Sequence, residues 1–349
     1  NKINLFSLWL MTLLVCVISI ILIGGYTRIS DSGLSITEWE PISGILFPLT
    51  SSAWNQEFDK YKLIDEFKLI NSAMTLQEFK LIYFWEWFHR AFARLIGAIY
   101  IIPFVYLAYH QKIEKKYSKN LFIIGLLLIT QAFIGWYMVK SGLVNRVDVS
   151  QYRLALHLTT AFIILGFIFH TLFTFYLDNK LISSRSIFSN NSSKLLLIFF
   201  ILVFFQISYG AFVSGTHSGL LYNTWPLYDS YLFPNVLNNS LFKINYLFEN
   251  SNLIIFIHRS FAILLCILLI FLNYKILVNK LSNKYLSLII LFNISFILQA
   301  ALGVAMTYLN IPWYLALLHQ GNSIIMFLLV FAMYLLSTKP SLNETQGRL

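Results

Sequence analysis

The chain is poor in charge and in cysteine. Only 11% of its 349 residues are Asp, Glu, Lys or Arg, whereas about a quarter is usual in soluble globular proteins. The two cysteines, Cys16 and Cys266, lie inside apolar runs, so we expect no structural disulfide. Hydrophobic residues make up 58% of the chain, and its mean hydropathy is +0.70. This composition excludes a soluble globular domain and indicates a polytopic membrane protein.

Eight segments are long and apolar enough to cross a bilayer, which takes about 20 predominantly apolar residues. They cover residues 7–26, 87–109, 120–140, 154–177, 194–215, 254–274, 285–309 and 313–336. None of them alternates with period two, which argues against a β-barrel. We therefore expect helices, whose backbone groups are hydrogen-bonded internally. The first segment lacks a small-residue cleavage site, so we interpret it as a retained span rather than a signal peptide.

The net charge of +10 is explained by basic loops on one side of a bilayer, without a nucleic-acid partner. The connections after the second, fourth and sixth segments hold Lys112, Lys115, Lys116, Lys119, Lys180, Arg185, Lys194, Lys275, Lys280 and Lys284. We expect these connections and both termini to face the cytoplasm or the mitochondrial matrix. The long connections at 27–86 and 216–253 then face outward, and short amphipathic helices are expected around 51–78.

An internal repeat is visible in the sequence. The matching segments and residues are 131–135 with 299–303, 32–34 with 218–220, Trp39 with Trp225, His89 with His258, and His157 with His319. The offset between the copies drifts with loop length, as it does in repeats whose loops vary.

The repeat predicts two units, residues 1–178 and 179–349. Each contains four segments, and an even number inserts both copies the same way up. We therefore expect an all-α polytopic membrane protein built from two parallel four-helix bundles. A pseudo-two-fold axis along the membrane normal would relate them.

Four of the seven histidines stand near the outward start of the even-numbered segments, two in each unit: His89, His157, His258 and His319. Paired imidazoles at one depth on facing helices suit bis-histidine ligation of haem iron, whereas zinc usually takes three or four ligands. The alternative is that each is an ordinary packed or hydrogen-bonded histidine. We interpret the remaining three as surface or core residues: His110, His170 and His217.

Arg90 and Arg259 directly follow the first histidine of each pair. Each guanidinium is suited to bind a haem propionate through paired hydrogen bonds, or simply to reach from the span to water, and both interpretations stay open. Arg94, one turn further along, either extends this basic strip or pairs with Glu86.

Glu86 breaks the repeat, because its counterpart is Ile255. It lies three residues before His89, so on a helix the two share a face, and ionisable groups at membrane depth usually mark function. A carboxylate beside a macrocycle can accept a proton. We therefore expect the first unit to be the reaction site and the second its redox partner. The alternative is an interfacial Glu86 bonded to Arg90 or Arg94.

Together these residues resemble the haem A synthase family. The segments that carry the resemblance are Gly24-Gly25-Tyr26-Thr27-Arg28 and Ser32-Gly33-Leu34-Ser35-Ile36 with Glu38, Trp39 and Pro41, together with Glu86 and the four paired histidines. The resemblance covers nearly the whole chain. The first outer loop has no cysteine pair, as in the branch of the family that lacks one.

The resemblance implies an inner-membrane enzyme, bacterial or mitochondrial, that oxidises the C8 methyl of haem O to a formyl group. The product, haem A, serves an aa3-type cytochrome oxidase. By the family pattern His89 and His157 would bind the substrate haem O and the product haem A, Glu86 would be the catalytic carboxylate, and His258 and His319 would hold a permanent haem b. The implied partners are the haem O synthase (protohaem farnesyltransferase), an electron acceptor or donor, and membrane lipid. Whether the chain forms a homo-oligomer is left open.

Two other functions are compatible with the composition. A non-enzymatic dihaem b-type electron carrier would not need Glu86, and the asymmetry at Ile255 argues against it. A transporter with parallel repeats would need helices broken at mid-membrane, and Pro103 is the main interruption of that kind.

Overall fold

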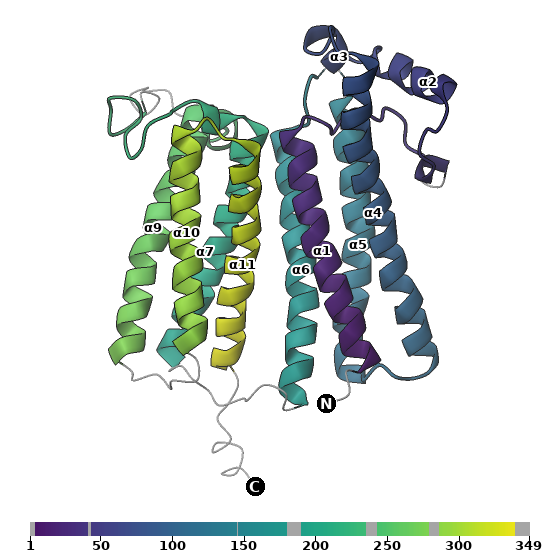
Figure 1. The fold of residues 1–349 in the computed structure, drawn as a ribbon. Coiled ribbons are helices and arrows are strands. Elements are labelled where there is room, and N and C mark those ends of the chain that lie inside the picture. The colour runs from purple at the N-terminus through teal and green to yellow at the C-terminus, as the bar shows by residue number, and fades with distance from the viewer. Residues whose placement is uncertain are drawn as a thin grey trace. The chain divides into compact units, whose positions relative to one another are not determined.

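The computed structural model describes residues 4–40, 43–144, 146–179, 190–234, 243–278 and 286–338. In this part of the chain eight helices are long and apolar enough to cross a membrane. They are α1 (Leu5–Ile29), α4 (Leu76–Tyr109), α5 (Lys115–Gly142), α6 (Gln151–Asp178), α7 (Asn190–Gly215), α9 (Ser251–Val278), α10 (Leu286–Tyr308) and α11 (Trp313–Thr338) (Figure 1). The prediction of an all-α polytopic membrane protein with eight spans is confirmed.

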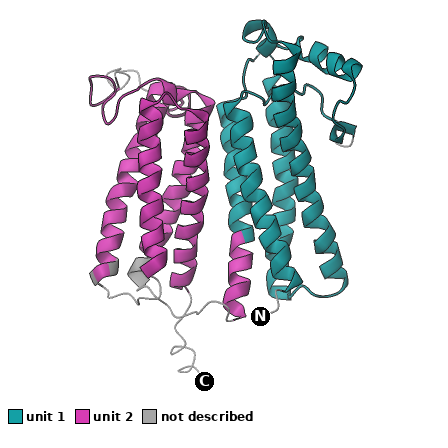
Figure 2. Cartoon of the chain, in the orientation of Figure 1, with its two compact units in different colours: residues 1–168 teal, residues 169–349 magenta. Residues whose placement is uncertain are grey.

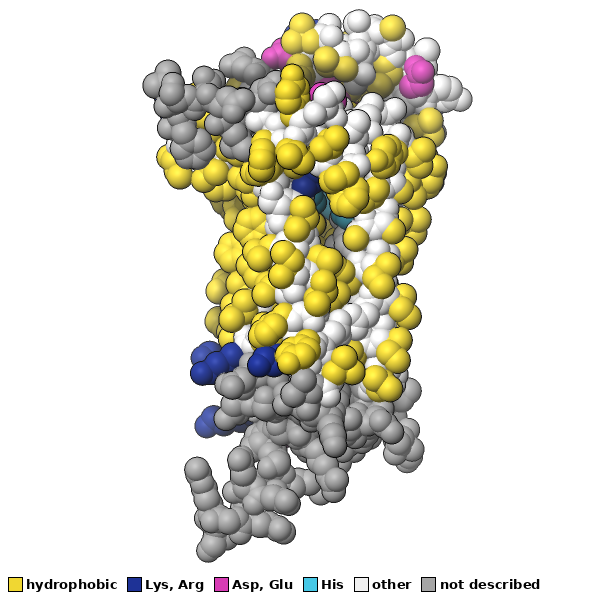
Figure 3. Space-filling model, turned by 90° about the vertical axis from the view of Figure 1, so that its left-hand side faces the viewer, with side chains coloured by type: hydrophobic (Ala, Val, Ile, Leu, Met, Phe, Trp, Pro, Cys, Tyr) yellow, Lys and Arg dark blue, Asp and Glu magenta, His cyan; other side chains and the backbone are white. Residues whose placement is uncertain are grey.

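Hydrophobic side chains cover the middle of the face shown in Figure 3. Asp and Glu lie towards its upper end and most of the visible Lys and Arg towards its lower end, while a basic side chain also lies beside a histidine in the upper half. This distribution suits a protein that spans a bilayer. Part of the basic set used to orient the chain lies outside the described residues, namely Lys180, Arg185, Lys280 and Lys284.

α4 begins eleven residues before the predicted start of the second span, because a capping box stops it from fraying there. The Glu78 amide donates to the Thr75 hydroxyl (3.3 Å), and the Thr75 amide donates to the Glu78 carboxylate (2.8 Å). The helix has 34 residues, about 51 Å of length, against a hydrocarbon core of about 30 Å. Its first turns therefore extend beyond the apolar layer.

Two short helices lie at the end where α4 begins, α2 (Ser51–Tyr61) and α3 (Asp65–Leu69) (Figure 1). The apolar side of α2 buries Trp54, Phe58 and Tyr61 against Phe79 and Tyr83 of α4. The prediction of short amphipathic helices around 51–78 is confirmed. The remaining short elements are η1 (Ser43–Ile45), η2 (Ser218–Leu220) and α8 (Tyr246–Glu249).

The chain forms two compact units, Asn1–Ile168 and Phe169–Leu349, with the boundary inside α6 (Figure 2). In the first unit the Trp9 indole donates to the Ile99 carbonyl (2.8 Å), which ties α1 to α4. The Tyr100 hydroxyl donates to the Leu121 carbonyl (2.7 Å), which ties α4 to α5. Such bonds hold helices together where neighbouring lipid is as apolar as the helix surfaces.

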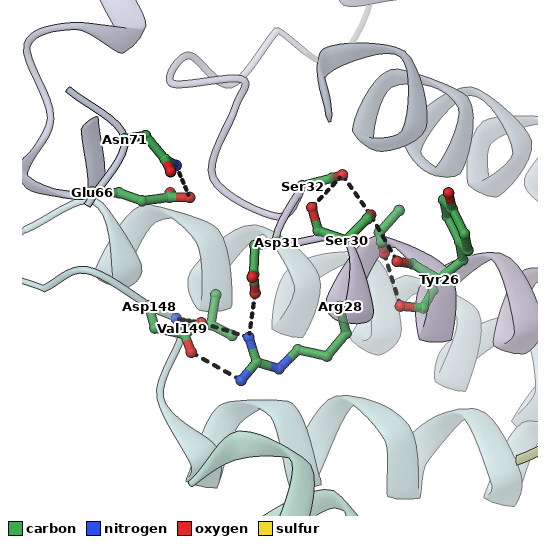
Figure 4. Close-up of polar contacts among 11 residues, drawn as sticks. Tyr26, Arg28, Ser30, Asp31, Ser32, Glu66, Asn71, Asp148 and Val149 are labelled. Carbon is green, nitrogen blue, oxygen red and sulfur yellow. Dashed lines mark hydrogen bonds and ion pairs between the residues drawn. The ribbon is translucent and has the colours of Figure 1, made fainter. Parts of the chain in front are cut away.

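We call the end of the first unit that carries the long connection between α1 and α4 its loop end. There Arg28, in the last turn of α1, pairs with Asp148 through both terminal nitrogens, each at 2.9 Å (Figure 4). Asp148 precedes α6, so this paired contact fixes the end of α1 to the start of α6. Paired guanidinium–carboxylate contacts of this kind are directional as well as strong.

In the second unit α7, α9, α10 and α11 enclose a core that includes Phe199, Phe292 and Val330. Polar side chains again tie the helices together. Asn273 and Asn293 exchange two hydrogen bonds (2.7 and 3.1 Å) between α9 and α10, and Ser295 donates to Asn322 (3.0 Å) between α10 and α11.

A buried carboxyl group lies in α3, one of the two short helices before α4. Glu66 of α3 is 5% exposed, accepts a long bond from the Asn71 amide (3.5 Å), and has no partner for Oε2 (Figure 4). Burial, with the charge of Glu86 adding to it, raises the pKa of Glu66 to about 8.

We predict that Glu66→Gln stabilises the protein at high pH. Between about pH 4, where the unfolded acid titrates, and about pH 8, only the folded chain holds the proton, so wild-type stability falls as pH rises through this window. A shift from about 4.5 to about 8, at about 1.4 kcal/mol per pKa unit, makes the variant about 4 kcal/mol more stable than wild type at pH 8 and equal to it near pH 4. Thermal unfolding across pH measures this, and the exposed Asp59→Asn is the control. A constant difference across pH would contradict a buried, protonated Glu66.

Candidate functional site

The four paired histidines lie near the helix ends that adjoin the long connections, which run from α1 to α4 in the first unit and from α7 to α9 in the second. His157, His258 and His319 lie within about the first two turns of α6, α9 and α11. His89 lies further along α4 because that helix begins earlier. All four side chains are partly buried.

Each of these imidazoles lies against a glycine of a neighbouring helix. A Cβ atom added at the glycine would come within 3.1–3.4 Å of the ring in every case, and the pairs are Gly24 with His89, Gly135 with His157, Gly210 with His258, and Gly303 with His319. The rings therefore occupy space that any larger residue would take. Each unit thus contains two glycine–histidine contacts.

The two imidazoles of the first unit face each other. The ring centroids of His89 and His157 are 6.4 Å apart, and the ring planes are inclined by 60°. With metal–nitrogen bonds of about 2 Å, two imidazoles on opposite sides of one metal ion have centroids about 6 Å apart.

Three of the four histidines have a buried Nδ1 atom without any hydrogen-bond partner: His157, His258 and His319. A buried polar atom left unpaired costs about 1–3 kcal/mol, and in all three rings this nitrogen faces the neighbouring glycine, 3.7–3.9 Å from the position of the added Cβ. Among the described residues no group of three or more His, Cys, Asp or Glu side chains gathers as a zinc site would require. Paired imidazoles with glycine behind each ring fit a planar iron macrocycle.

Glutamines support two of the histidine-bearing helices, and sequence reasoning missed this role. Gln131 donates to the His157 carbonyl (3.0 Å), and Gln206 donates to the His258 carbonyl (2.9 Å). Each glutamine lies four residues before the glycine that contacts the same histidine. The signal was present in the sequence, since Gln-x-x-x-Gly occurs at 131–135, 206–210 and 299–303.

Glu86 is buried, and donors surround its carboxylate. Oε1 accepts from Arg90 (2.6 Å), while Oε2 accepts from the Ser35 hydroxyl (2.7 Å) and the Ile36 amide (2.8 Å). These bonds hold the first outer loop against α4, three residues before His89. The pairing with Arg90 raised in the sequence analysis is present, and Arg94 donates to the Glu40 carbonyl (2.8 Å).

Arg90 and Arg259 make the same contacts in their own units. Each donates to two loop carbonyls two residues apart: Ile36 (3.0 Å) and Glu38 (3.2 Å) for Arg90, Tyr222 (3.3 Å) and Thr224 (3.0 Å) for Arg259. These carbonyls correspond by the offset that aligns Ser32 with Ser218. In both units an arginine next to a histidine fixes the outer loop.

The second unit has no acid at the position of Glu86. Ile255 is buried there, and the Arg259 guanidinium lies 4.9 Å from the centre of the Tyr228 ring. The two arginines therefore have different neighbours: Arg90 lies beside a carboxylate, and Arg259 lies beside a tyrosine ring.

The other histidines have different surroundings. His110 is exposed just after α4, and His217 is exposed in the outer loop with φ 52°. His170 stacks on Phe331 with ring centroids 6.3 Å apart. None of these contacts resembles the glycine contacts of the paired histidines.

Comparison with known proteins identifies the relatives of this chain. The family model COX15-CtaA, described as "Cytochrome oxidase assembly protein", matches residues 7–331. A protein of Pelagibacter ubique named "Heme A synthase" is 38% identical over 93% of this chain and 94% of its own length.

Two further relatives carry the same name. The protein of Wolbachia pipientis wMel is 40% identical over 92% of this chain and 89% of its own length. That of Bartonella tribocorum is 37% identical over 91% and 88%. With a family match from the first span to the last and relatives at this identity, the chain belongs to the COX15-CtaA family of cytochrome oxidase assembly proteins.

Proposed function

We propose that this chain is a haem A synthase, an enzyme that oxidises the C8 methyl of haem O to a formyl group and so supplies haem A to an aa3-type cytochrome oxidase. One observation carries the proposal. A buried carboxylate, Glu86, lies on the helix of His89 beside the facing imidazole pair, and the second unit has Ile255 in its place. The shared name of the relatives agrees with it.

In this proposal the two histidine pairs have different tasks. His89 and His157 hold the substrate haem, and His258 and His319 hold a permanent haem b, which supplies one-electron redox chemistry when bound. The glycine behind each ring and the unpaired Nδ1 atoms support these assignments. The units proposed from the repeat, 1–178 and 179–349, are then a substrate unit and a redox unit.

Glu86 is the proposed catalytic residue, with Oε2 as the atom that accepts a proton when the methyl group is oxidised. The Ser35 hydroxyl and the Ile36 amide aim this oxygen, and Arg90 holds Oε1. A guanidinium has five N–H donors, so Arg90 and Arg259 keep N–H groups for the propionates in addition to those bound to the loops.

The proposed location is the inner membrane of a bacterium or a mitochondrion. Lys112, Lys115, Lys116 and Lys119 near the α4–α5 turn indicate that this end faces the cytoplasm or matrix, together with both termini. The histidine-bearing ends then face outward. Haem O would arrive through lipid from the farnesyltransferase that makes it, and an external acceptor would remove the electrons.

Extraction of pigments from the purified protein tests the function. A synthase should yield haem b together with haem O or haem A. Haem b alone, at two per chain, would overturn the proposal in favour of a dihaem electron carrier.

We predict that Glu86→Gln keeps haem b but converts haem O poorly. The amide preserves the shape of the side chain and cannot accept the proton, so turnover should fall by about 100-fold or more. Haem O or a hydroxylated intermediate should accumulate in extracted pigments. Asp59→Asn, which changes an exposed carboxylate of α2 paired with Lys62, is the control. Normal haem A formation in Glu86→Gln would remove this residue from the mechanism.

We predict that variants of the two histidine pairs lose different haems. His258→Ala or His319→Ala should lose the resident haem b, because each removes one of the two imidazoles that would hold it. His89→Ala or His157→Ala should keep haem b and lose the bound substrate haem. Pyridine haemochrome spectra measure both. An unchanged haem b content in the His258 and His319 variants would contradict the assignment of the second unit.

The glycine contacts predict that alanine substitutions in the two units affect different haem sites. Gly303→Ala places a Cβ 3.3 Å from His319, and Gly135→Ala places one 3.1 Å from His157, so each should turn one ring. Gly303→Ala should shift the low-spin electron paramagnetic resonance signal of haem b, and Gly135→Ala should weaken haem O binding by about 10-fold, equivalent to about 1.4 kcal/mol. Gly97→Ala, whose Cβ meets nothing within 4 Å, is the control. Identical effects of both variants on haem b would contradict separate sites.

A further inference from the structure

The first unit has a cavity of about 240 Å³ at its loop end. The outer loop contributes Glu38 and Trp39 to its wall, α4 contributes Arg90, and α5 contributes Trp136, Val139 and Lys140. The lining is mixed: it has two tryptophans, two cations and one carboxylate, and the remaining side chains are Ile36, Thr37, Val139 and Leu143.

Two residues that line the cavity lie close in sequence to the histidine site. Val139 lies one turn after Gly135, the residue that contacts His157, so the two share a face of α5. Arg90 directly follows His89 on α4. A flat ligand held between the two imidazoles would therefore have one edge directed towards this cavity.

Lys140 is the cation of the cavity whose charge is not already matched. Glu38 pairs with Lys60 (2.7 Å), and Arg90 pairs with Glu86 (2.6 Å). Lys140 forms no ion pair with any residue that the structure describes, and its Nζ lies 5.1 Å from the centre of the Trp136 ring.

The second unit has neutral residues at the corresponding positions. The register that aligns 131–135 with 299–303 places Tyr308 at the position of Lys140 and Val304 at that of Trp136. The Tyr308 hydroxyl donates to the carbonyl of Trp225 (2.7 Å), the counterpart of Trp39. Here a neutral hydrogen bond ties helix to loop, whereas the first unit leaves a cation beside a cavity.

We propose that this cavity binds a carboxylate side chain of the porphyrin substrate, a propionate, with Lys140 as its counter-ion and Arg90 as a second donor. The proposal rests on the proposed function, because it requires a porphyrin between His89 and His157. A carboxylate is costly within the hydrocarbon layer, so the charged edge of the macrocycle belongs at the loop end. An exposed lysine suits a ligand that must leave after turnover, while the Tyr308 bond suits a pigment that stays.

The test is a titration of ferric protohaem into the purified full chain in phosphatidylcholine nanodiscs. The free acid is compared with its dimethyl ester, which keeps the ring and iron and loses both carboxylates. Lys140→Gln should weaken binding of the acid about 5-fold, the upper end of what an ion pair with an exposed lysine contributes, and Lys140→Arg should restore most of it. The ester should bind wild type and Lys140→Gln equally.

Two results would overturn the subsite: an unchanged affinity of Lys140→Gln for the acid, or equal losses for acid and ester. Repeating the titration in phosphatidylglycerol nanodiscs tests whether Lys140 binds a lipid phosphate instead of the porphyrin. In that case Lys140→Gln would alter the thermal stability of the protein differently in the two lipids and leave its affinity for the acid unchanged.

The variant His89→Ala distinguishes a failure of the subsite from a failure of the proposed function. If wild type binds no porphyrin in a His89-dependent manner, the function itself is wrong; if it does and Lys140 has no selective effect, only the subsite is wrong.

Discussion

The contact between an imidazole and the bare backbone of a glycine on the next helix is the constraint on which the site depends. It occurs four times, at Gly24, Gly135, Gly210 and Gly303. In a helix bundle the closest approach between two helices is set by the side chains between them. Glycine lets the ring lie directly against the neighbouring helix, through Cε1 in His157, His258 and His319 and through Nε2 in His89. Three unpaired buried Nδ1 atoms show that the surrounding protein does not satisfy these rings by itself.

The two units share this frame and differ in what surrounds it. In both, an arginine beside the first histidine binds two carbonyls of the outer loop. In the first unit the same arginine also binds Glu86, whose second oxygen is held by Ser35 and Ile36. In the second unit Ile255 leaves no acid there. The first unit thus has a buried carboxylate and a cavity lined by Arg90 and Lys140, and the second has Ile255 and Tyr308 at the positions of Glu86 and Lys140. We propose that this difference separates a substrate site from a permanent cofactor site.

Much of the fold could be predicted from the sequence because it depends on composition and periodicity. The eight spans follow from apolar length, and the histidine pairs follow from the repeat. The start of α4 could not be predicted from hydropathy, because the capping box at Thr75 and Glu78 extends the helix through polar sequence. The glycine contacts depend on how each helix is rotated, and helices apolar on all sides do not record that rotation in their pattern. The loop carbonyls bound by Arg90 depend on the path of an irregular segment, which local sequence does not determine.

Electron paramagnetic resonance of the purified protein, before and after addition of ferric haem O, tests the central claim most directly. The account predicts a low-spin signal of a bis-imidazole iron from the resident pigment, and a second such signal that appears with haem O and is absent in His157→Ala. A high-spin signal from either pigment, or a second signal that persists without His157, would contradict the claim that facing imidazoles hold both macrocycles.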